Sequence, residues 1–518
     1  MLSCVPSWFQ LLPPLSSPSM PVDYDLVVIG SSAAGIQAAI AAAQLKARVV
    51  LVDQGCATSK ISDAPVLSAM GQTLKQLQRG EQLGLGTTEA AFPSEATLWT
   101  QAQRWSVAAK AASAEPQSPA VLSAMGIEVI SGSGEFHRKP KLGWLVNGRS
   151  LRSRAYLLAI DSLRVSLQTE PTAVGTVLAP LAAIDGLTTV GYLTADVVLQ
   201  KLPALASRQL VIIGRDAIGI ELAQSLVRLG RSVMLIVPDA QLLPHEDAEA
   251  AFLIQAQLEA EGVEVLTETS VSQVREIDGK KWVQAGNRAI ETDEIILAMT
   301  PPFDQTSLNL PAANVKQSSS GILVNAKLQT TNPRIYACRG RIAGYDTPHI
   351  AIADAKVALK NALFLPIAKV SERPVPTVVA THPPLARVGQ TETTAVQRYG
   401  ADVIILRQPF KTLAKAQLQD ETTGFCKLLV HRNGELLGAH IAGWQADELI
   451  STIALAMQQK LKIQAIAALV LPSSSLAVIL QQTAAEWQRL RLQKNTRLQD
   501  FLEGFFNWRR SVPISHIK

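Results

Sequence analysis

Two stretches of the chain, residues 25–53 and 209–237, share a pattern that few folds can accommodate. Each begins with an apolar strand, continues through a glycine-containing turn into a helix rich in small and aliphatic residues, and ends with a second apolar strand. In the first stretch, Gly30 permits the tight turn and Gly35 permits close packing of helix on strand. The order strand, turn, helix, strand is typical of a dinucleotide-binding unit. The sequence therefore predicts an α/β protein with two Rossmann-like dinucleotide-binding domains.

The first of these units carries the residue types that a dinucleotide needs. Ser32 replaces the middle glycine of the usual turn and is small enough to be tolerated there. Backbone N–H groups at the start of the helix would face a pyrophosphate, whose negative charge the helix dipole favours. An acidic residue at the end of the second strand would accept hydrogen bonds from a ribose. The predicted cofactor-binding residues are Gly30, Ser32, Ala33, Gly35 and Asp53.

The second unit keeps the fold signal but offers a poorer ligand site. Gly214 and Gly219 stand at the first and last glycine positions, whereas Asp216 stands at the middle one. A carboxylate at this position would repel a pyrophosphate and obstruct its approach. The second strand ends at Val237 where a ribose-binding acid is expected, and Asp239 could substitute only if the loop shifts. We predict a dinucleotide fold here with a weakened site.

Composition excludes several other classes of protein. The 518 residues leave room for several domains, and 47% of them are hydrophobic, which rules out wholesale disorder. No apolar run approaches the roughly 18 residues of a membrane span. The four cysteines are far apart and form no metal-ligand spacing or disulfide framework, so we expect a cytoplasmic protein without a metal site.

The positive charge is concentrated at the carboxyl end. From Trp487 onward there are seven basic and two acidic residues, a balance of +5 that equals the net charge of the whole chain. The rest has no net charge that would argue for nucleic acid. Residues 1–20 are predicted to be a disordered leader. The carboxyl-terminal segment has apolar residues at helical spacing, and it could lie on an anionic membrane surface or pack on the body or a dimer partner. These apolar residues are Leu498, Phe501, Leu502, Phe505 and Trp508.

Further motifs complete a resemblance. The sequences LLPHED at 242–247, TTNPRIYA at 330–337 and THPPLARVGQTETTA at 381–395 accompany the two units. The chain resembles the flavin-dependent pyridine nucleotide–disulfide oxidoreductases, such as dihydrolipoamide dehydrogenase, glutathione reductase and mercuric reductase. The resemblance implies a homodimer that binds FAD in the first unit and NAD(P)H in the second. It divides the chain into an FAD-binding domain (21–168 and 297–370), an NAD(P)-binding-like domain (169–296), an α+β dimerisation domain (373–485) and a basic amphipathic tail (486–518).

Several of the family's reactive residues are absent. The family's redox motif has two cysteines, but GCATSK at 55–60 keeps only Cys56. This matches the flavin-facing thiol and could be a reactive thiolate or an inert buried cysteine. The family's His–Glu proton relay is replaced by LPSSSL at 471–476. Arg339 and Gly340 replace the Gly-Asp that would meet the flavin ribityl chain, although an arginine could still meet a phosphate.

One charged pair near the flavin is retained. In the family a lysine pairs with a glutamate close to the flavin ring, and Lys60 and Glu221 stand at these places. The alternative is a structural ion pair that persists without cofactor. We predict an FAD-binding oxidoreductase without dithiol–disulfide activity, with Cys56, Lys60 and Glu221 as catalytic residues and an unknown small-molecule or protein electron acceptor. The competing hypothesis is a non-catalytic homodimer that docks on a membrane surface or a protein.

Overall fold

The computed structural model describes most of the chain. The described residues are 22–55, 63–82, 95–160, 165–167, 184–195, 197–202, 208–298, 305–318, 321–339, 341–342, 345–346, 348–370 and 375–511. The predicted leader at 1–20, Cys56, Lys60 and Gly340 lie outside these ranges.

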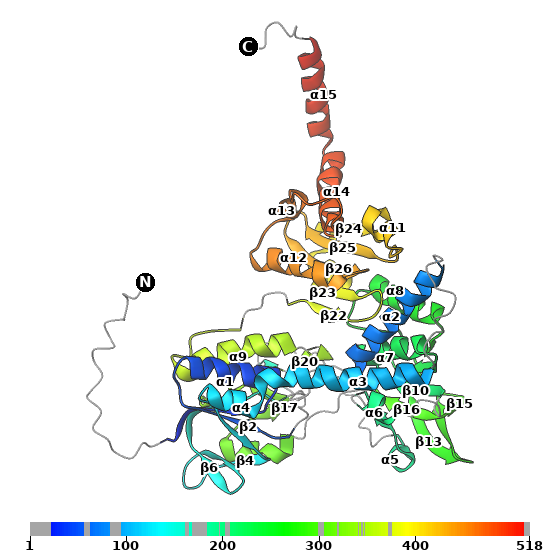
Figure 1. The fold of residues 1–518 in the computed structure, drawn as a ribbon. Coiled ribbons are helices and arrows are strands. Elements are labelled where there is room, and N and C mark those ends of the chain that lie inside the picture. Colours follow the sequence, from blue (N-terminus) through cyan, green and yellow to red (C-terminus); the bar gives the residue numbers. More distant parts are fainter. Residues whose placement is uncertain are drawn as a thin grey trace, which may run out of the picture.

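The first sheet joins strands from two distant parts of the sequence. Five strands pair in parallel, with Val27 opposite both Val50 and Tyr156 in the central strands. In order across the sheet they are β19 (Ile335–Ala337), β7 (Ser153–Leu158), β1 (Tyr24–Ile29), β2 (Val49–Asp53) and β3 (Glu128–Ser131). Helices α1 (Ala33–Gln44) and α9 (Pro348–Leu363) lie side by side against this sheet (Figure 1). Because β19 and α9 come after the second unit in sequence, the first unit is discontinuous.

Small elements complete this part of the chain. Three antiparallel strands, β4 (Gly134–His137), β5 (Gly143–Val146) and β6 (Arg149–Leu151), form a separate sheet. Another sheet contains β17 (Gln317–Ser318), β18 (Gly321–Val324) and β8 (Val165–Leu167), and β20 (Arg341–Ile342) pairs with β21 (Tyr345–Asp346). The helices are α2 (Asp63–Gln82), α3 (Glu95–Ala114) and α4 (Pro119–Ala124).

The second unit repeats the parallel arrangement. Its sheet has the order β12 (Glu264–Leu266), β11 (Ser232–Ile236), β10 (Gln209–Ile213), β16 (Glu294–Leu297) and β9 (Leu193–Thr194). Its helices are α5 (Leu187–Val190), α6 (Val198–Lys201), α7 (Ala217–Arg228) and α8 (Ala248–Ala260). A three-stranded sheet, β13 (Val271–Ile277), β14 (Lys280–Ala285) and β15 (Arg288–Thr292), is inserted before β16. Helix α2 packs along α7, so the first unit reaches across to the second (Figure 1).

The third part is an antiparallel sheet with helices. Its order is β22 (Thr377–Val379), β23 (Leu385–Gly389), β26 (Leu436–Ala442), β25 (Phe425–His431) and β24 (Val403–Pro409). The helices are α10 (Glu392–Tyr399), α11 (Ala414–Leu418), α12 (Ala446–Gln458), α13 (Ile463–Ala467) and α14 (Val478–Lys494). The predicted fold class is therefore confirmed: two parallel α/β units and an α+β domain.

The predicted start of the tail at residue 486 falls inside a packed helix. Helix α14 continues to Lys494, and Trp487 is buried in the core of the third part. The exposed part is α15 (Thr496–Ser511), which has no buried residue and projects from the molecule (Figure 1). Among the described residues, no helix is both long and apolar enough to cross a membrane.

Candidate functional site

The turn between β1 and α1 is as tight as the sequence predicts. Gly30 has a φ of 106°, and a Cβ at this position would lie 2.4 Å from the carbonyl oxygen of Ala159. A Cβ on Gly35 would lie 2.2 Å from the carbonyl oxygen of Gly30. Both distances are far below van der Waals contact, so any side chain would force β1, α1 and β7 apart. The two glycines therefore fix the geometry of the turn.

The start of α1 presents backbone donors. The hydroxyl of Ser32 caps the helix by accepting a hydrogen bond from the amide of Gly35 at 3.2 Å. The amides of Ala33 and Ala34 have no acceptor among the described residues. Free N–H groups at a helix N-terminus, together with the helix dipole, form a site suited to an anion.

The carboxylate of Asp53 lies where β2 ends. Its Oδ1 accepts hydrogen bonds from the Ser31 hydroxyl at 2.7 Å and from the Gly55 amide at 3.1 Å. Its Oδ2 makes no hydrogen bond within the described part of the chain, and the side chain is only partly covered. One oxygen is thus held in place while the other can accept from a ribose hydroxyl. Together with the free amides of α1, this carboxylate fits the adenosine diphosphate half of FAD.

The sequence left open that Arg339 meets a phosphate, but the structure places its side chain elsewhere. Its guanidinium donates to both carboxylate oxygens of Asp354 on α9, at 2.8 and 3.0 Å, and its amide donates to the same carboxylate. Both side chains are buried, with 10% and 2% exposed. A guanidinium held by a buried carboxylate is not available to a ligand, so Arg339 ties β19 to α9.

In the second unit, close packing explains why glycine stands at both positions of the turn. A Cβ on Gly214 would lie 2.4 Å from the Ala298 carbonyl oxygen, and one on Gly219 would lie 2.8 Å from the Ala298 Cβ. Asp216 is the N-cap residue of α7, and its side chain makes no capping hydrogen bond. The glycines are therefore needed to pack α7 against the sheet whether or not a nucleotide binds.

An ion pair spans the turn of the second unit. The Arg215 guanidinium contacts both oxygens of Asp239, at 3.2 and 3.4 Å. Both side chains are mostly covered. Asp239 thus reaches back to the turn, but its carboxylate is engaged by a cation of the same site. Burial and the cations Arg215 and Arg387 lower the pKa of nearby His245, which keeps this imidazole neutral.

Glu221 lies on α7 with a deeply covered carboxyl group. Its Oε1 accepts a hydrogen bond from the Ala380 amide at 2.7 Å, and burial raises the pKa of the carboxyl to about 7. The Ala380 carbonyl accepts from Ser68 on α2. The Glu221 carboxyl is therefore close to its titration midpoint at neutral pH, where a nearby cation would favour the ionised form. Its predicted partner Lys60 lies outside the described residues, so the ion pair stays a prediction.

The two described cysteines are not redox candidates. Cys338 and Cys426 are buried, and burial raises the pKa of the Cys426 thiol to about 12 and that of Cys338 well above its usual value. A thiol that resists ionisation is a poor nucleophile. His382, in turn, is bound to Glu421 at 3.1 Å and joins α7 through Gln224. Within the described ranges no cluster of three or more metal-binding side chains occurs.

Comparison with known proteins identifies the family. Residues 24–357 match the pyridine nucleotide-disulphide oxidoreductase family, and residues 375–483 match its dimerisation domain. The chain belongs to this family. Its predicted FAD and NAD(P)H are consistent with a family of FAD-dependent oxidoreductases that use NAD(P)H as substrate, and the matched dimerisation domain indicates homodimers in this family.

Curated relatives and solved structures agree with this assignment. The chain is 29% identical to a mercuric reductase of Staphylococcus aureus, over 85% of this chain and 78% of the relative. It is 29% identical to a dihydrolipoyl dehydrogenase of Bacillus subtilis, over 83% of this chain and 92% of the relative. Its fold is similar to that of the HOCl-induced flavoprotein disulfide reductase RclA from Escherichia coli, with a TM-score of 0.72 at 22% identity over 89% and 99% of the two chains.

The motifs did not reveal every residue of the candidate site. Arg215 occupies an unrestricted position between Gly214 and Asp216, so no pattern singled it out. The sequence indicates its partner Asp239 only as a possible ribose ligand. The sequence signal for this ion pair is a basic residue in the turn after β10 and an acidic residue shortly after the adjacent strand β11.

Proposed function

We propose that this protein is a flavoprotein oxidoreductase that binds FAD through its first unit and has lost dithiol–disulfide exchange. The observation that carries the proposal is that two groups suited to a dinucleotide occur in the same unit. The start of α1 has amides without an acceptor among the described residues, and Asp53 has one carboxylate oxygen that makes no hydrogen bond there. These groups suit a pyrophosphate and a ribose. When bound, FAD would supply the redox chemistry.

The proposed roles follow the structure and the family pattern. Gly30 and Gly35 shape the turn, Ser32 and Ala33 start the helix that faces the pyrophosphate, and Asp53 holds the ribose. Glu221 and Lys60 would lie near the flavin ring, where Lys60 keeps the carboxylate ionised. Cys56 is the proposed thiol beside the flavin.

The loss of dithiol chemistry rests on three absences in the sequence and on the two described thiols. The first redox cysteine, the relay histidine and the relay glutamate are missing at their family positions. Cys338 and Cys426 are buried and protonated, so neither offers a second sulfur to Cys56. The remaining chemistry is electron transfer from the flavin site to an acceptor other than a disulfide.

The nicotinamide site of the second unit is proposed to be weak. A dinucleotide would need the backbone of the turn and a free acid at the strand end, and Arg215 and Asp239 already neutralise each other there. Asp216 adds a negative charge at the start of α7. Binding would therefore require that the ion pair open.

A second proposed activity is attachment to an anionic membrane surface through α15. Its large apolar side chains are exposed, and Phe505 contacts Phe501, Phe506 and Trp508. The basic residues of the tail complement a negatively charged surface. The same helix is the feature that would serve a non-catalytic docking protein, if FAD were not bound.

The deciding experiment is the visible absorption spectrum of the purified full-length protein after incubation with FAD. We expect an oxidised flavin spectrum that remains after gel filtration. Asp53→Asn should weaken FAD binding about tenfold, the equivalent of losing one good charge-assisted hydrogen bond. Asp25→Asn is the matched control, because Asp25 lies on the neighbouring strand β1 and its carboxylate accepts a hydrogen bond from the Arg48 amide.

The outcomes separate the two hypotheses. Retained flavin with a selective Asp53→Asn defect supports the proposed oxidoreductase. Absence of flavin in the wild-type protein at saturating FAD would reject it and leave the non-catalytic docking protein.

A further inference from the structure

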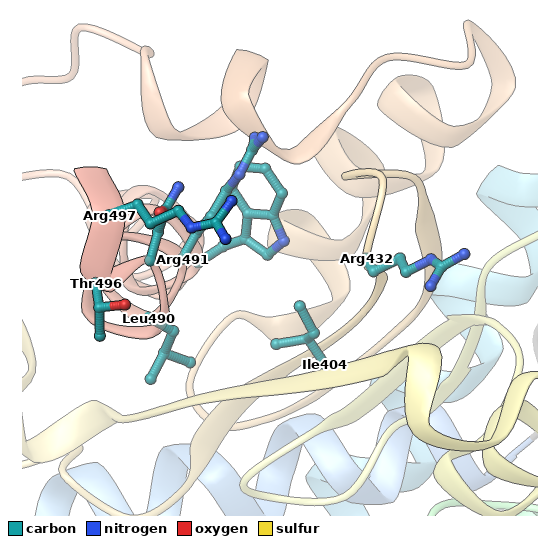
Figure 2. A pocket seen from close by; sticks show the side chains of 8 residues that line it. Ile404, Arg432, Leu490, Arg491, Thr496 and Arg497 are labelled. Carbon is teal, nitrogen blue, oxygen red and sulfur yellow. The ribbon is translucent and has the colours of Figure 1, made fainter. Parts of the chain in front are cut away.

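A cavity of about 420 Å³ lies where the last two helices meet, remote from both nucleotide units. Its walls come from β24, the turn after β25, the end of α14 and the start of α15 (Figure 2). The lining residues are Ile404, Arg432, Trp487, Leu490, Arg491, Asn495, Thr496 and Arg497. Three of the eight are arginines and none is acidic. A cavity of this size accommodates a small organic molecule rather than a bare ion.

Two of the arginines have no carboxylate partner in the described part of the chain. The Arg491 guanidinium lies 5.2 Å from the centre of the Trp487 ring, which holds it in place. Arg497 enters from the first turn of α15, and both side chains point into the same space in Figure 2. Arg432 lies across the cavity and pairs with Asp402 at 3.2 Å, so it contributes less free charge. The cavity therefore carries an excess of positive charge.

A buried donor also lacks an acceptor at this place. Trp487 is 2% exposed, and its Nε1–H has no hydrogen-bond partner among the residues that the structure describes. An unsatisfied buried donor costs stability unless a ligand or water accepts from it. The amides of Thr496 and Arg497 at the start of α15 have no acceptor among the described residues either. Several kinds of donor thus converge on one space.

We infer that this cavity binds a phosphate-bearing ligand. Guanidinium groups and helix N-terminal amides are the donors that phosphate oxygens prefer. Ile404 and Leu490 provide an apolar wall for the part of the molecule that carries the phosphate. The phosphate can come from a soluble phosphate monoester or from a phospholipid head group. The site requires neither FAD nor the proposed membrane attachment.

The test is calorimetric titration of the full-length protein with glycerol 3-phosphate at constant ionic strength. We expect saturable binding with one site per chain. Arg491→Met and Arg497→Met should each weaken it about tenfold, and Trp487→Phe, which keeps the ring but removes the N–H, several-fold. The matched control is Arg489→Met: Arg489 lies on the same helix, pairs with Glu486 and does not line the cavity.

Vesicles distinguish the two sources of phosphate. For a lipid head group, Trp487→Phe weakens binding to vesicles of phosphatidylcholine with phosphatidic acid, and glycerol 3-phosphate competes. For a soluble ligand, Trp487→Phe weakens calorimetric binding several-fold while vesicle binding is unchanged. No saturable binding in either arm, or an equal loss in Arg489→Met, would overturn the inference, because only diffuse charge would then be involved.

Discussion

At the scale of single residues, the second unit shows how a nucleotide fold can persist while its site changes. Gly214 and Gly219 remain because their neighbours leave no room for a Cβ. Arg215 and Asp239 instead pair with each other across the turn, with 12% and 23% of their side chains exposed. Packing therefore preserves the fold signature independently of ligand binding.

Opening the turn of the second unit should restore access for nicotinamide. In Arg215→Gly/Asp216→Gly the ion pair and the added negative charge are both removed, so we expect NADH or NADPH to reduce the bound flavin about tenfold faster. Stopped-flow measurement of flavin bleaching checks this. Arg288→Gln, an exposed change in the same unit, should leave the rate unchanged. An unaltered rate in the double variant would place the defect elsewhere.

The predicted Lys60–Glu221 pair has a characteristic pH dependence. Burial gives the Glu221 carboxyl a pKa of about 7 in the folded protein against an ordinary value of 4.5, so ionisation of this carboxyl lowers the stability of the fold. In Lys60→Met we expect the free energy of unfolding to fall by up to about 3 kcal/mol as pH rises from 4.5 through 7. In the double variant Lys60→Met/Glu221→Gln, the free energy of unfolding should not show this decrease, because the titrating carboxyl is gone.

Wild type should show a smaller fall than Lys60→Met, because the cation keeps Glu221 ionised at lower pH. Denaturant unfolding at each pH gives the comparison, with the exposed Lys356→Met as the control. Superimposable curves for Lys60→Met and wild type would show that Lys60 does not face Glu221.

At the scale of elements, a buried lysine joins the second unit to the antiparallel sheet. Lys427 on β25 is 3% exposed, and its Nζ contacts Asp247, Glu249 and Glu392 at 2.8, 2.7 and 3.0 Å. These three carboxylates come from the start of α8 and from α10. The surrounding carboxylates raise the pKa of Lys427, so it stays charged and holds the elements together.

Removing this cation should loosen the junction. Lys427→Met leaves the buried Asp247 without its partner, and we expect a loss of about 3–5 kcal/mol in the free energy of unfolding. Lys427→Met/Asp247→Asn should recover part of the loss because the unpaired charge is gone. Chemical denaturation measures both, with Lys411→Met as an exposed control. A loss below about 1 kcal/mol would be the range of a surface pair and would contradict this role.

At the scale of the whole molecule, α15 is the helix whose apolar side chains are left exposed. A helix of 16 residues with five exposed large apolar side chains is unusual on a protein surface. These side chains are Leu498, Phe501, Phe505, Phe506 and Trp508. A membrane surface or a second subunit would cover them.

The proposed membrane attachment predicts a specific loss. Phe501→Ser/Trp508→Ser should lower binding to anionic vesicles about a hundredfold or more, since each buried aromatic contributes roughly 1.5–3 kcal/mol. Sedimentation with vesicles measures this, and Phe364→Ser, an exposed change just after α9, is the control. If the double variant instead dissociates the dimer while vesicle binding is unchanged, the helix packs on the partner subunit.

Sequence by itself determined the class of fold and the position of the first site. Strand–turn–helix–strand patterns depend on local spacing, and the glycines, Ser32 and Asp53 act within a few residues of their own turn. Long-range contacts had no such signal. The Arg339–Asp354 and Arg215–Asp239 pairs, the Lys427 junction and the arginine-lined cavity each join residues from separate elements. Only tertiary packing decides which charged groups meet, because a charge can be satisfied by many partners whereas a tight turn tolerates few residues.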